Sequence, residues 1–252
     1  MRILSKIFSF RTIQYVFLFF AITHPYQIHA SLVTFEDGTF SDSNWTLTLL
    51  VGPTGGQSGI QEAAGGNPAA FREVTTNTGS LVRVFHADPA NVFAPSSGQI
   101  NTLDFRIDYN ALDTFGLGQG FGLMLKQGSG YYVSSSTNFV TGSAVQDVWL
   151  TKSVTGLTES DFALIIGSGA LDFSTSGSPI TFGFETFNSG GNGIIAGYDN
   201  WKVTLDTEAS NAAVPEPSSF VLLLSVSIVI AGFILLRKCR RKTLLADNAG
   251  AV

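Results

Sequence analysis

The sequence predicts an all-β protein, an antiparallel β-sandwich of the jelly-roll type, followed by one C-terminal transmembrane helix. Two observations predict the sandwich. Short segments alternate apolar and polar residues at a period of two, which is typical of strands with one buried face. Clusters of glycine, proline, asparagine and serine separate these segments and form turns. A third observation, an uncharged apolar run near the C-terminus, predicts the membrane helix.

Six segments show the alternation, and residues 103–109 show it most clearly, because four apolar residues there alternate with three charged ones. The other five predicted strands are 81–85, 121–125, 148–150, 180–184 and 201–205. Only residues 89–93 and 158–163 look helical, and both are short. Many short strands with glycine-rich turns favour two packed sheets.

The chain divides into five predicted regions: a signal peptide (1–30), an exported β-sandwich (31–206), a linker (207–218), a transmembrane helix (219–236) and a basic cytoplasmic tail (237–252). In the first region, three basic residues precede the apolar segment 13–22, and Ile28-His29-Ala30 forms a cleavage site before Ser31. An uncleaved N-terminal anchor is the alternative, for which the apolar segment is short.

The apolar segment 220–236 contains 17 residues and no charge. At about 1.5 Å per residue it spans roughly 25 Å, close to the ~30 Å hydrocarbon core of a bilayer. A basic cluster follows, formed by Arg237, Lys238, Arg240, Arg241 and Lys242. The positive-inside rule places this cluster in the cytoplasm and the domain on the other side. An ordinary C-terminal anchor that no protease cuts is one interpretation.

The end of the chain also resembles a known sorting signal. The residues Val214, Pro215, Glu216 and Pro217, the apolar segment and the basic cluster together resemble the PEP-CTERM signal of bacteria that make extracellular polysaccharide. The resemblance implies an exosortase-type membrane protease as partner. It also implies a single-pass stage in the inner membrane, with the domain outside the cytoplasm, and then release to the cell surface or extracellular matrix.

The composition of residues 31–213 excludes several function classes. This region has no cysteine, one histidine (His86), and six basic against 17 acidic residues, a net charge of −11. Such a charge argues against nucleic acid as a partner. A cysteine nucleophile and a multi-histidine zinc site are excluded as well. We interpret His86 as an edge or surface residue, and the region as suited to a neutral partner such as a polysaccharide, or to a cation.

Catalysis by paired carboxylates is the remaining enzymatic option. Asp104 and Asp108 lie on one strand face about 13 Å apart, too far for an easy acid and nucleophile pair. We therefore interpret them as part of an exposed, charged strand face and expect no enzyme.

Both ends of the domain resemble jelly-roll carbohydrate-binding modules. Residues 33–39 read Val-Thr-Phe-Glu-Asp-Gly-Thr, and residues 197–203 read Gly-Tyr-Asp-Asn-Trp-Lys-Val. The resemblance implies neighbouring first and last strands that share a structural Ca²⁺, with carboxylates from Glu36 and Asp199. The alternative is a turn at Asp37-Gly38 and a strand cap at Asp199.

Sugar binding requires aromatic rings that stack on the sugar and polar groups that bind its hydroxyls. The predicted stacking residues are Trp45, Tyr131, Tyr132 and Trp149, for which a place in the core is the alternative. The first expectation for function is a non-enzymatic structural or adhesive protein of the envelope or matrix. A module that binds exopolysaccharide comes second, and a carboxylate-dependent glycoside hydrolase or lyase comes third.

Overall fold

The computed structural model describes residues 30–113, 119–141, 146–189 and 193–208. The predicted signal peptide up to residue 29, the Pro-Glu-Pro box, the transmembrane segment and the basic tail lie outside these residues. Among the described residues, no helix is long and apolar enough to cross a membrane.

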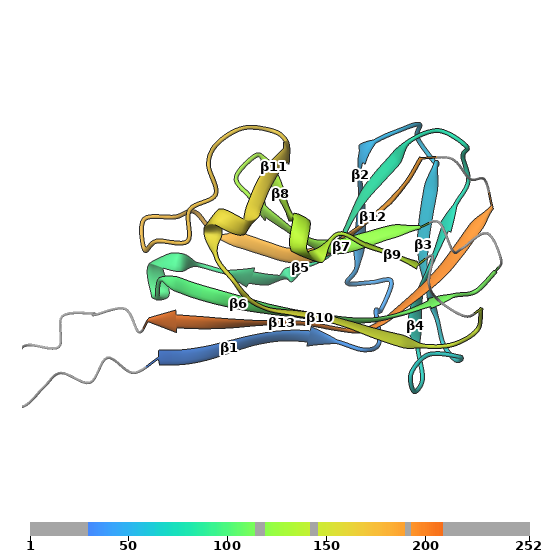
Figure 1. Cartoon of the computed structure of the whole chain (residues 1–252), viewed down its shortest axis with the longest axis horizontal. Coiled ribbons are helices and arrows are strands. Elements are labelled where there is room, and N and C mark those ends of the chain that lie inside the picture. The colour runs from blue at the N-terminus through green and yellow to red at the C-terminus, as the bar shows by residue number, and fades with distance from the viewer. Residues whose placement is uncertain (1–29, 114–118, 142–145, 190–192, 209–252) are drawn as a thin grey trace, which may run out of the picture. The chain divides into compact units, whose positions relative to one another are not determined.

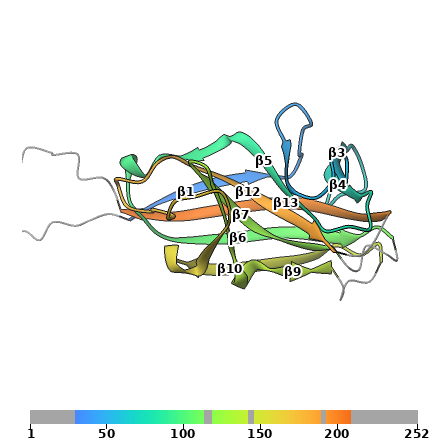
Figure 2. The same cartoon turned by 90° about the horizontal axis from the view of Figure 1, so that it is seen from above.

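Two antiparallel sheets form the described part, which confirms the predicted all-β sandwich (Figures 1 and 2). Sheet A has the order β10-β6-β13-β4-β3 with β1 beside β13, and sheet B has the order β11-β8-β7-β12-β5-β2 with β9 beside β7. The strands of sheet A are β1 (Ala30–Asp37), β3 (Gln57–Glu62), β4 (Phe71–Thr76), β6 (Ile100–Ala111), β10 (Leu150–Leu157) and β13 (Ile194–Glu208). The strands of sheet B are β2 (Thr46–Val51), β5 (Val82–Phe93), β7 (Gly120–Gln127), β8 (Gly130–Ser134), β9 (Phe139–Val140), β11 (Phe162–Ile166) and β12 (Ile180–Asn188).

Strand β13 organises sheet A. Its first part pairs with β4 and its second part pairs with β1, while β6 runs along its other edge. The register against β6 shifts between Asp199 and Lys202, and Asn200 has a positive φ of 49°. Asparagine tolerates this left-handed conformation better than most residues. The first and last strands are therefore neighbours, as the carbohydrate-binding resemblance implies.

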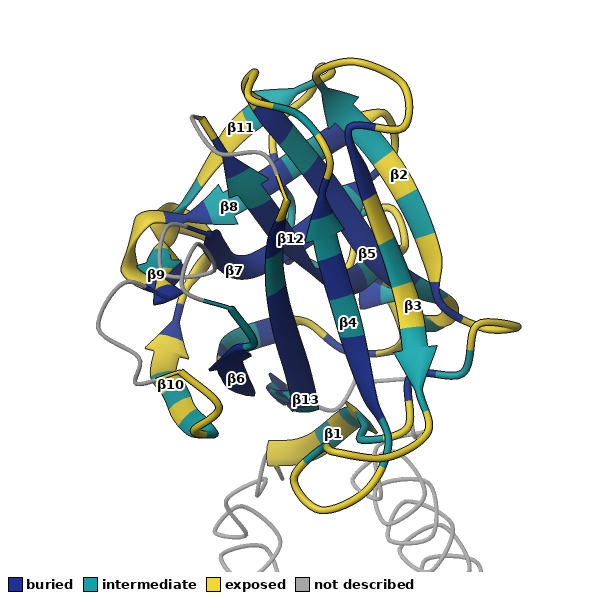
Figure 3. Cartoon of the chain, turned by 90° about the vertical axis from the view of Figure 1, so that its right-hand side faces the viewer, coloured by how far each residue is buried: buried dark blue, intermediate teal, exposed yellow. Residues whose placement is uncertain are grey.

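The core lies between the sheets and follows the alternation in the sequence. On β6, the residues Leu103, Phe105, Ile107 and Tyr109 are buried. Aromatic rings meet across the interface: Tyr109 contacts Phe121 of sheet B with ring centroids 4.8 Å apart. In Figure 3, β12 and β13 are mostly buried, whereas β3 and β10 carry exposed bands. Burial of apolar area, worth about 25 cal/mol per Å², therefore holds the two sheets together.

Two short predicted helices are corrected. Residues 89–93 form the end of β5, where Pro89 lies at the register shift against β12 between Thr181 and Gly183. A proline is tolerated there because the strand is not continuously paired. The segment 158–163 contains only the 3-10 turn Glu159–Asp161, capped by Thr158 and Asp161, before β11 begins. The predicted strand at 148–150 begins at Leu150.

His86 is buried in the middle of the sandwich, which corrects its interpretation as a surface residue. Its Nδ1 accepts a hydrogen bond from Nε of Arg72 at 3.1 Å, and its Nε2 lies 2.8 Å from Oγ1 of Thr186. Burial, followed by the charge of Arg72, holds the pKa of His86 well below its usual value. The ring is therefore neutral, and its two nitrogens join β4 of sheet A to β12 of sheet B.

Candidate functional site

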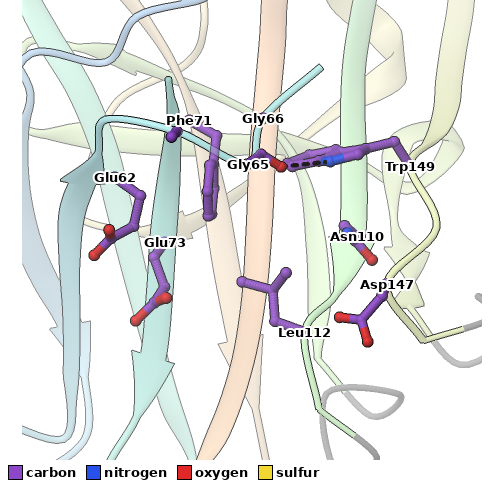
Figure 4. Close-up of a pocket in the computed structure, with 10 residues that line it drawn as sticks. Glu62, Gly65, Gly66, Phe71, Glu73, Asn110, Leu112, Asp147 and Trp149 are labelled. Carbon is purple, nitrogen blue, oxygen red and sulfur yellow. Dashed lines mark hydrogen bonds between the residues drawn. The ribbon is translucent and has the colours of Figure 1, made fainter. Parts of the chain in front are cut away.

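A hollow of about 520 Å³ lies on the outer face of sheet A (Figure 4). Strands β3, β4, β13 and β6 form its base, and the loop 63–70 and the segment before β10 form its rim. Its side chains are Glu62, Phe71, Glu73, Asn110, Leu112, Asp147 and Trp149. Phe71, Glu73 and Asn110 alternate with core residues on their strands, and for this reason they point away from the sandwich interior.

Trp149 and Phe71 form an aromatic pair in the hollow. Their ring centroids lie 5.4 Å apart at an interplanar angle of 74°. Nε1 of Trp149 donates a hydrogen bond to the carbonyl oxygen of Gly65 at 3.0 Å, which fixes the indole ring (Figure 4). Both rings lie close to Gly197 of β13, where a Cβ atom would come within 2.9 Å of Trp149 and 3.1 Å of Phe71. The absence of a side chain at Gly197 makes room for the pair.

The polar side chains of the hollow are acidic or amide groups. Glu62 and Glu73 lie on one side, and Asn110 and Asp147 lie on the other, with Leu112 between them (Figure 4). Burial, followed by the charge of Glu62, raises the pKa of Glu73. The backbone N–H of Asp147 donates to the carbonyl of Ala111 at 3.0 Å, which places this aspartate beside the end of β6.

Asn110 lines the hollow and has an unsatisfied acceptor. The residue is only 3% exposed, and its Oδ1 atom has no hydrogen-bond partner among the described residues. Leaving a buried polar atom without a partner costs about 1–3 kcal/mol. A ligand that donates an O–H or N–H to this oxygen would recover that free energy. The arrangement is suited to binding a molecule with an apolar face and several donors.

A second group of carboxylates, here called the buried aspartate cluster, comprises Asp108 and Asp199, which are buried beneath the loop 63–70, and the half-buried Asp37 beside them. Asp108 is fully buried, which corrects the interpretation of its strand face as exposed, whereas Asp104 is exposed as expected. The physical reason is the loop, since Nδ2 of Asn67 donates to Asp108 Oδ2 at 3.1 Å and covers it.

The buried aspartate cluster fastens the rim of the hollow. The backbone N–H of Asn67 donates to Asp199 Oδ2, and Nδ2 of Asn200 donates to Asp108 Oδ2 at 2.8 Å. A Cβ atom at Gly66 would lie 2.8 Å from Asp199 Oδ2, so only glycine allows the loop to approach this closely. Oγ1 of Thr151 donates to Asp108 Oδ1 at 2.6 Å and ties β10 to the same cluster.

The pKa values of Asp37 and Asp199 depend on burial and on the hydrogen bonds that each carboxylate accepts. Burial acts to raise the pKa of Asp37, but hydrogen bonds from the Trp45 side chain and from Thr39 and Phe40 outweigh burial and lower it. Burial raises the pKa of Asp199. The amides of Asn67 and Asn200 oppose this rise, and the charges of Asp108 and Asp37 add to it.

The structure places the two predicted calcium ligands differently. Glu36 is exposed, and its carboxylate pairs with Nζ of Lys202 at 3.0 Å. The charges that act on Asp199 come from Asp108 and from Asp37, the residue after Glu36. Within the described ranges, no group of three or more His, Cys, Asp or Glu side chains is arranged to hold a metal ion. Each oxygen of Asp199 accepts one backbone hydrogen bond, Oδ2 from Asn67 and Oδ1 from Asn200. The predicted calcium site stays a prediction.

The four predicted stacking residues lie in three different environments. Trp45 and Tyr132 are buried in the core, and Nε1 of Trp45 donates to Asp37 Oδ2 at 2.7 Å. Tyr131 is half-buried on the outer face of sheet B, where its ring contacts Phe85 at 5.6 Å between centroids. Trp149 is half-buried and lines the hollow.

The sequence interpretation missed Glu62, Phe71, Glu73, Asn110 and Asp147. Alternation on β6 could have identified Asn110, because it follows the core residue Tyr109 and therefore faces outward. No local spacing could have joined the others, since they come from segments that are up to 85 positions apart in the sequence and meet only through sheet A.

No family model matches the chain, and no curated protein matches it. Solved structures overlap with it loosely. A family 11 carbohydrate-binding module from Clostridium thermocellum, in complex with a β-1,3-1,4-mixed-linked tetrasaccharide, is 13% identical, and the match covers 70% of this chain and 95% of that chain at a TM-score of 0.44.

Two further solved structures also overlap loosely with the chain. A protein of unknown function from Shewanella oneidensis is 15% identical over 76% of this chain and 94% of that chain, at a TM-score of 0.42. A xylan-binding domain of carbohydrate-binding module family 22 from Paenibacillus barcinonensis is 11% identical over 71% and 96%, at 0.38. With TM-scores below 0.5, these likenesses carry no argument about function.

Proposed function

We propose that this protein is a non-enzymatic polysaccharide-binding protein of the cell envelope or extracellular matrix, and that the hollow around Trp149 holds the sugar chain. One observation carries the proposal: a fixed, half-buried indole ring lies in the same hollow as Asn110, whose buried Oδ1 lacks a donor. The apolar face of a sugar ring packs on an indole, and its hydroxyl groups donate hydrogen bonds to amide and carboxylate oxygens.

The size and composition of the hollow support this proposal. Its volume of about 520 Å³ falls in the range of roughly 300–1,000 Å³ that is usual for small-molecule sites. It combines two aromatic rings with four polar side chains, Glu62, Glu73, Asn110 and Asp147, which surround Leu112. A sugar has the same combination of apolar faces and hydroxyl groups at its edges.

Binding should depend on Trp149 and not on exposed aromatics in general. The test is calorimetry of the full chain in detergent with a panel of neutral, acidic and amino-sugar oligosaccharides. Trp149→Ala should weaken binding at least about tenfold, which corresponds to roughly 1.4 kcal/mol. Tyr131→Ala, the matched control on the outer face of sheet B, should leave affinity unchanged. Equal affinities of the two variants would contradict the proposed site.

A carboxylate-dependent glycoside hydrolase or lyase is the second candidate. One observation favours it: the pKa of Glu73 is raised, and a general acid requires a shift in this direction. An enzyme would release reducing ends from at least one polysaccharide of the panel, and Glu73→Gln would abolish that release. We expect no release from any substrate by the wild-type protein.

We also propose that a PEP-CTERM signal sorts the protein, with Val214, Pro215, Glu216 and Pro217 as the segment that an exosortase-type protease reads. The support is the sequence order of box, uncharged 17-residue segment and basic cluster. Replacing Pro215, Glu216 and Pro217 by alanine should leave a membrane-bound protein that keeps residues 220–252, as intact mass would show. Normal processing and release of this variant would overturn the sorting proposal.

A further inference from the structure

The carboxylates of the hollow form few contacts with charged or polar groups of the described residues. Among the described residues, Glu62, Glu73 and Asp147 form no ion pair, and no lysine or arginine lines the hollow. The one hydrogen bond to this set within the described residues comes from Oγ1 of Thr75, which lies 3.4 Å from Glu73 Oε1, at the long end of the range.

The buried Asn110 is an independent observation at the same place. Its Oδ1 is an acceptor without a partner, on the same side of the hollow as Asp147 (Figure 4). The indole N–H of Trp149, a donor on the rim, is already used by Gly65. The side-chain oxygens of Glu62, Asp147 and Asn110 therefore have no donor among the described residues, and Glu73 has only the long contact from Thr75. Three of these four side chains are carboxylates.

A ligand that matches this surface has to supply donors and positive charge at several points. A neutral sugar supplies hydroxyl donors but leaves three carboxylates without a counter-charge. An ammonium group has three donors and no acceptor, and it forms short, charge-assisted hydrogen bonds with carboxylates. It also binds favourably over the face of an indole ring. A sugar that carries a uronic acid would be repelled.

We infer that the hollow selects polysaccharides with free amino groups, such as polymers of glucosamine, over neutral and acidic polysaccharides. The inference rests on the proposed function, because it assumes that the hollow binds a sugar chain. Trp149 stacks on one sugar ring, while Glu62 and Glu73 on one side and Asp147 on the other bind amino groups of the ring and its neighbours.

The test separates this selectivity from the general attraction between a polycation and an acidic domain. The full chain in detergent is titrated by calorimetry with three tetrasaccharides: the glucosamine tetramer, the N-acetylglucosamine tetramer and cellotetraose, at a pH where the amines are protonated. The glucosamine tetramer should bind about tenfold more tightly than the other two, as expected for two or three partly exposed ion pairs. Added salt should reduce this preference.

A matched pair of double variants locates the effect. Glu62→Gln with Glu73→Gln removes two charges from the hollow, and Asp88→Asn with Asp104→Asn removes two charges elsewhere. The first variant should lose the preference, so that it binds the glucosamine tetramer and cellotetraose with equal affinity. The second variant should behave like the wild type.

The outcomes distinguish this inference from the proposed function. Equal binding of the three tetramers that depends on Trp149 would overturn the amino-sugar selectivity and leave the proposed function standing. A preference that survives in the Glu62 and Glu73 variant would also overturn the inference, since it would reflect overall charge. Binding of none of the three tetramers, together with none of the larger panel, would overturn both.

Discussion

Two groups of carboxylates lie on sheet A, and they differ in what the chain supplies to them. In the buried aspartate cluster, every carboxylate accepts hydrogen bonds from the protein. Asp37, for example, accepts them from Thr39, Phe40 and Trp45. In the hollow, Glu62, Glu73 and Asp147 have only the long contact from Thr75 among described residues. The same chemical group thus holds the fold together in one place and is available to a ligand in the other.

The two groups are also connected. The loop 63–70 is fastened to Asp108 and Asp199 through Asn67, and its Gly65 carbonyl fixes the indole of Trp149. The buried aspartate cluster therefore positions the rim of the hollow. The aspartates beneath the loop accept hydrogen bonds from the protein. The acceptors in the hollow, of which the loop forms the rim, stay open to a ligand.

The largest expected effect on stability comes from removing a carboxylate of the buried aspartate cluster. Asp108→Ala removes the acceptor of three hydrogen bonds, which the side chains of Asn67, Asn200 and Thr151 donate. At about 1 kcal/mol for each lost hydrogen bond, the free energy of unfolding should fall by roughly 3 kcal/mol. Urea unfolding of the full chain in detergent measures the change. Asp104→Ala, an exposed position on the same strand, should cost less than about 1 kcal/mol, and equal costs would contradict the contrast.

Glu185 on sheet B extends the comparison to a third kind of carboxylate. It is buried, and its Oε2 atom lies near a cation but accepts no hydrogen bond from the described residues. Nε of Arg83 lies 3.2 Å away without hydrogen-bond geometry. Burial raises the pKa of Glu185 to about 7, and Arg83 only partly offsets this rise. The folded state binds this proton more tightly than the unfolded state, so stability is highest below the unfolded pKa and falls as the pH rises towards about 7.

Glu185→Gln should therefore change the pH dependence of stability. The variant should gain about 3 kcal/mol over the wild type at pH 8 and little at pH 4, where the carboxyl is largely protonated in both states. Thermal unfolding between pH 4 and pH 8 measures both curves. If the stability of the two proteins changed with pH in parallel, Glu185 would ionise in the folded state without a cost in stability.

The floor of the hollow offers a smaller and more specific perturbation. Gly197→Ala places a Cβ atom 2.9 Å from Trp149 and 3.1 Å from Phe71, which displaces the aromatic pair. Affinity for the oligosaccharide that binds best should fall about tenfold, roughly 1.4 kcal/mol. Gly79→Ala, where nothing lies within 4 Å of the new atom, is the control for calorimetry. Unchanged affinity in Gly197→Ala would place the ligand elsewhere.

Calcium removal is the smallest expected effect. The oxygens of Asp199 already accept hydrogen bonds from the backbone amides of Asn67 and Asn200, so chelation with EDTA should leave the melting temperature unchanged. A drop in the melting temperature would support the predicted Ca²⁺, since a ligand that binds only the folded state stabilises it.

Alternation in the sequence was sufficient to predict the sandwich, because Phe105 and Ile107 reach the core from an antiparallel strand just as the period of two requires. It also assigns a face to Asp108, but a strand pattern cannot show that a loop 41 positions earlier covers that face. His86 shares the inward alternation of Val82 and Val84, and its burial required a partner, Arg72, on the other sheet. Trp149 was among the predicted stacking residues, but its surroundings come from distant strands.

The most direct test of the central claim is a fluorescence titration of the full chain in detergent with the glucosamine, N-acetylglucosamine and cello-tetrasaccharides. The chain has three tryptophans, and Trp45 and Trp201 are buried in the core. We predict a saturable change in tryptophan emission with at least one tetrasaccharide, which Trp149→Phe abolishes. The absence of any change, or the same change in Trp149→Phe, would contradict a sugar site at this hollow.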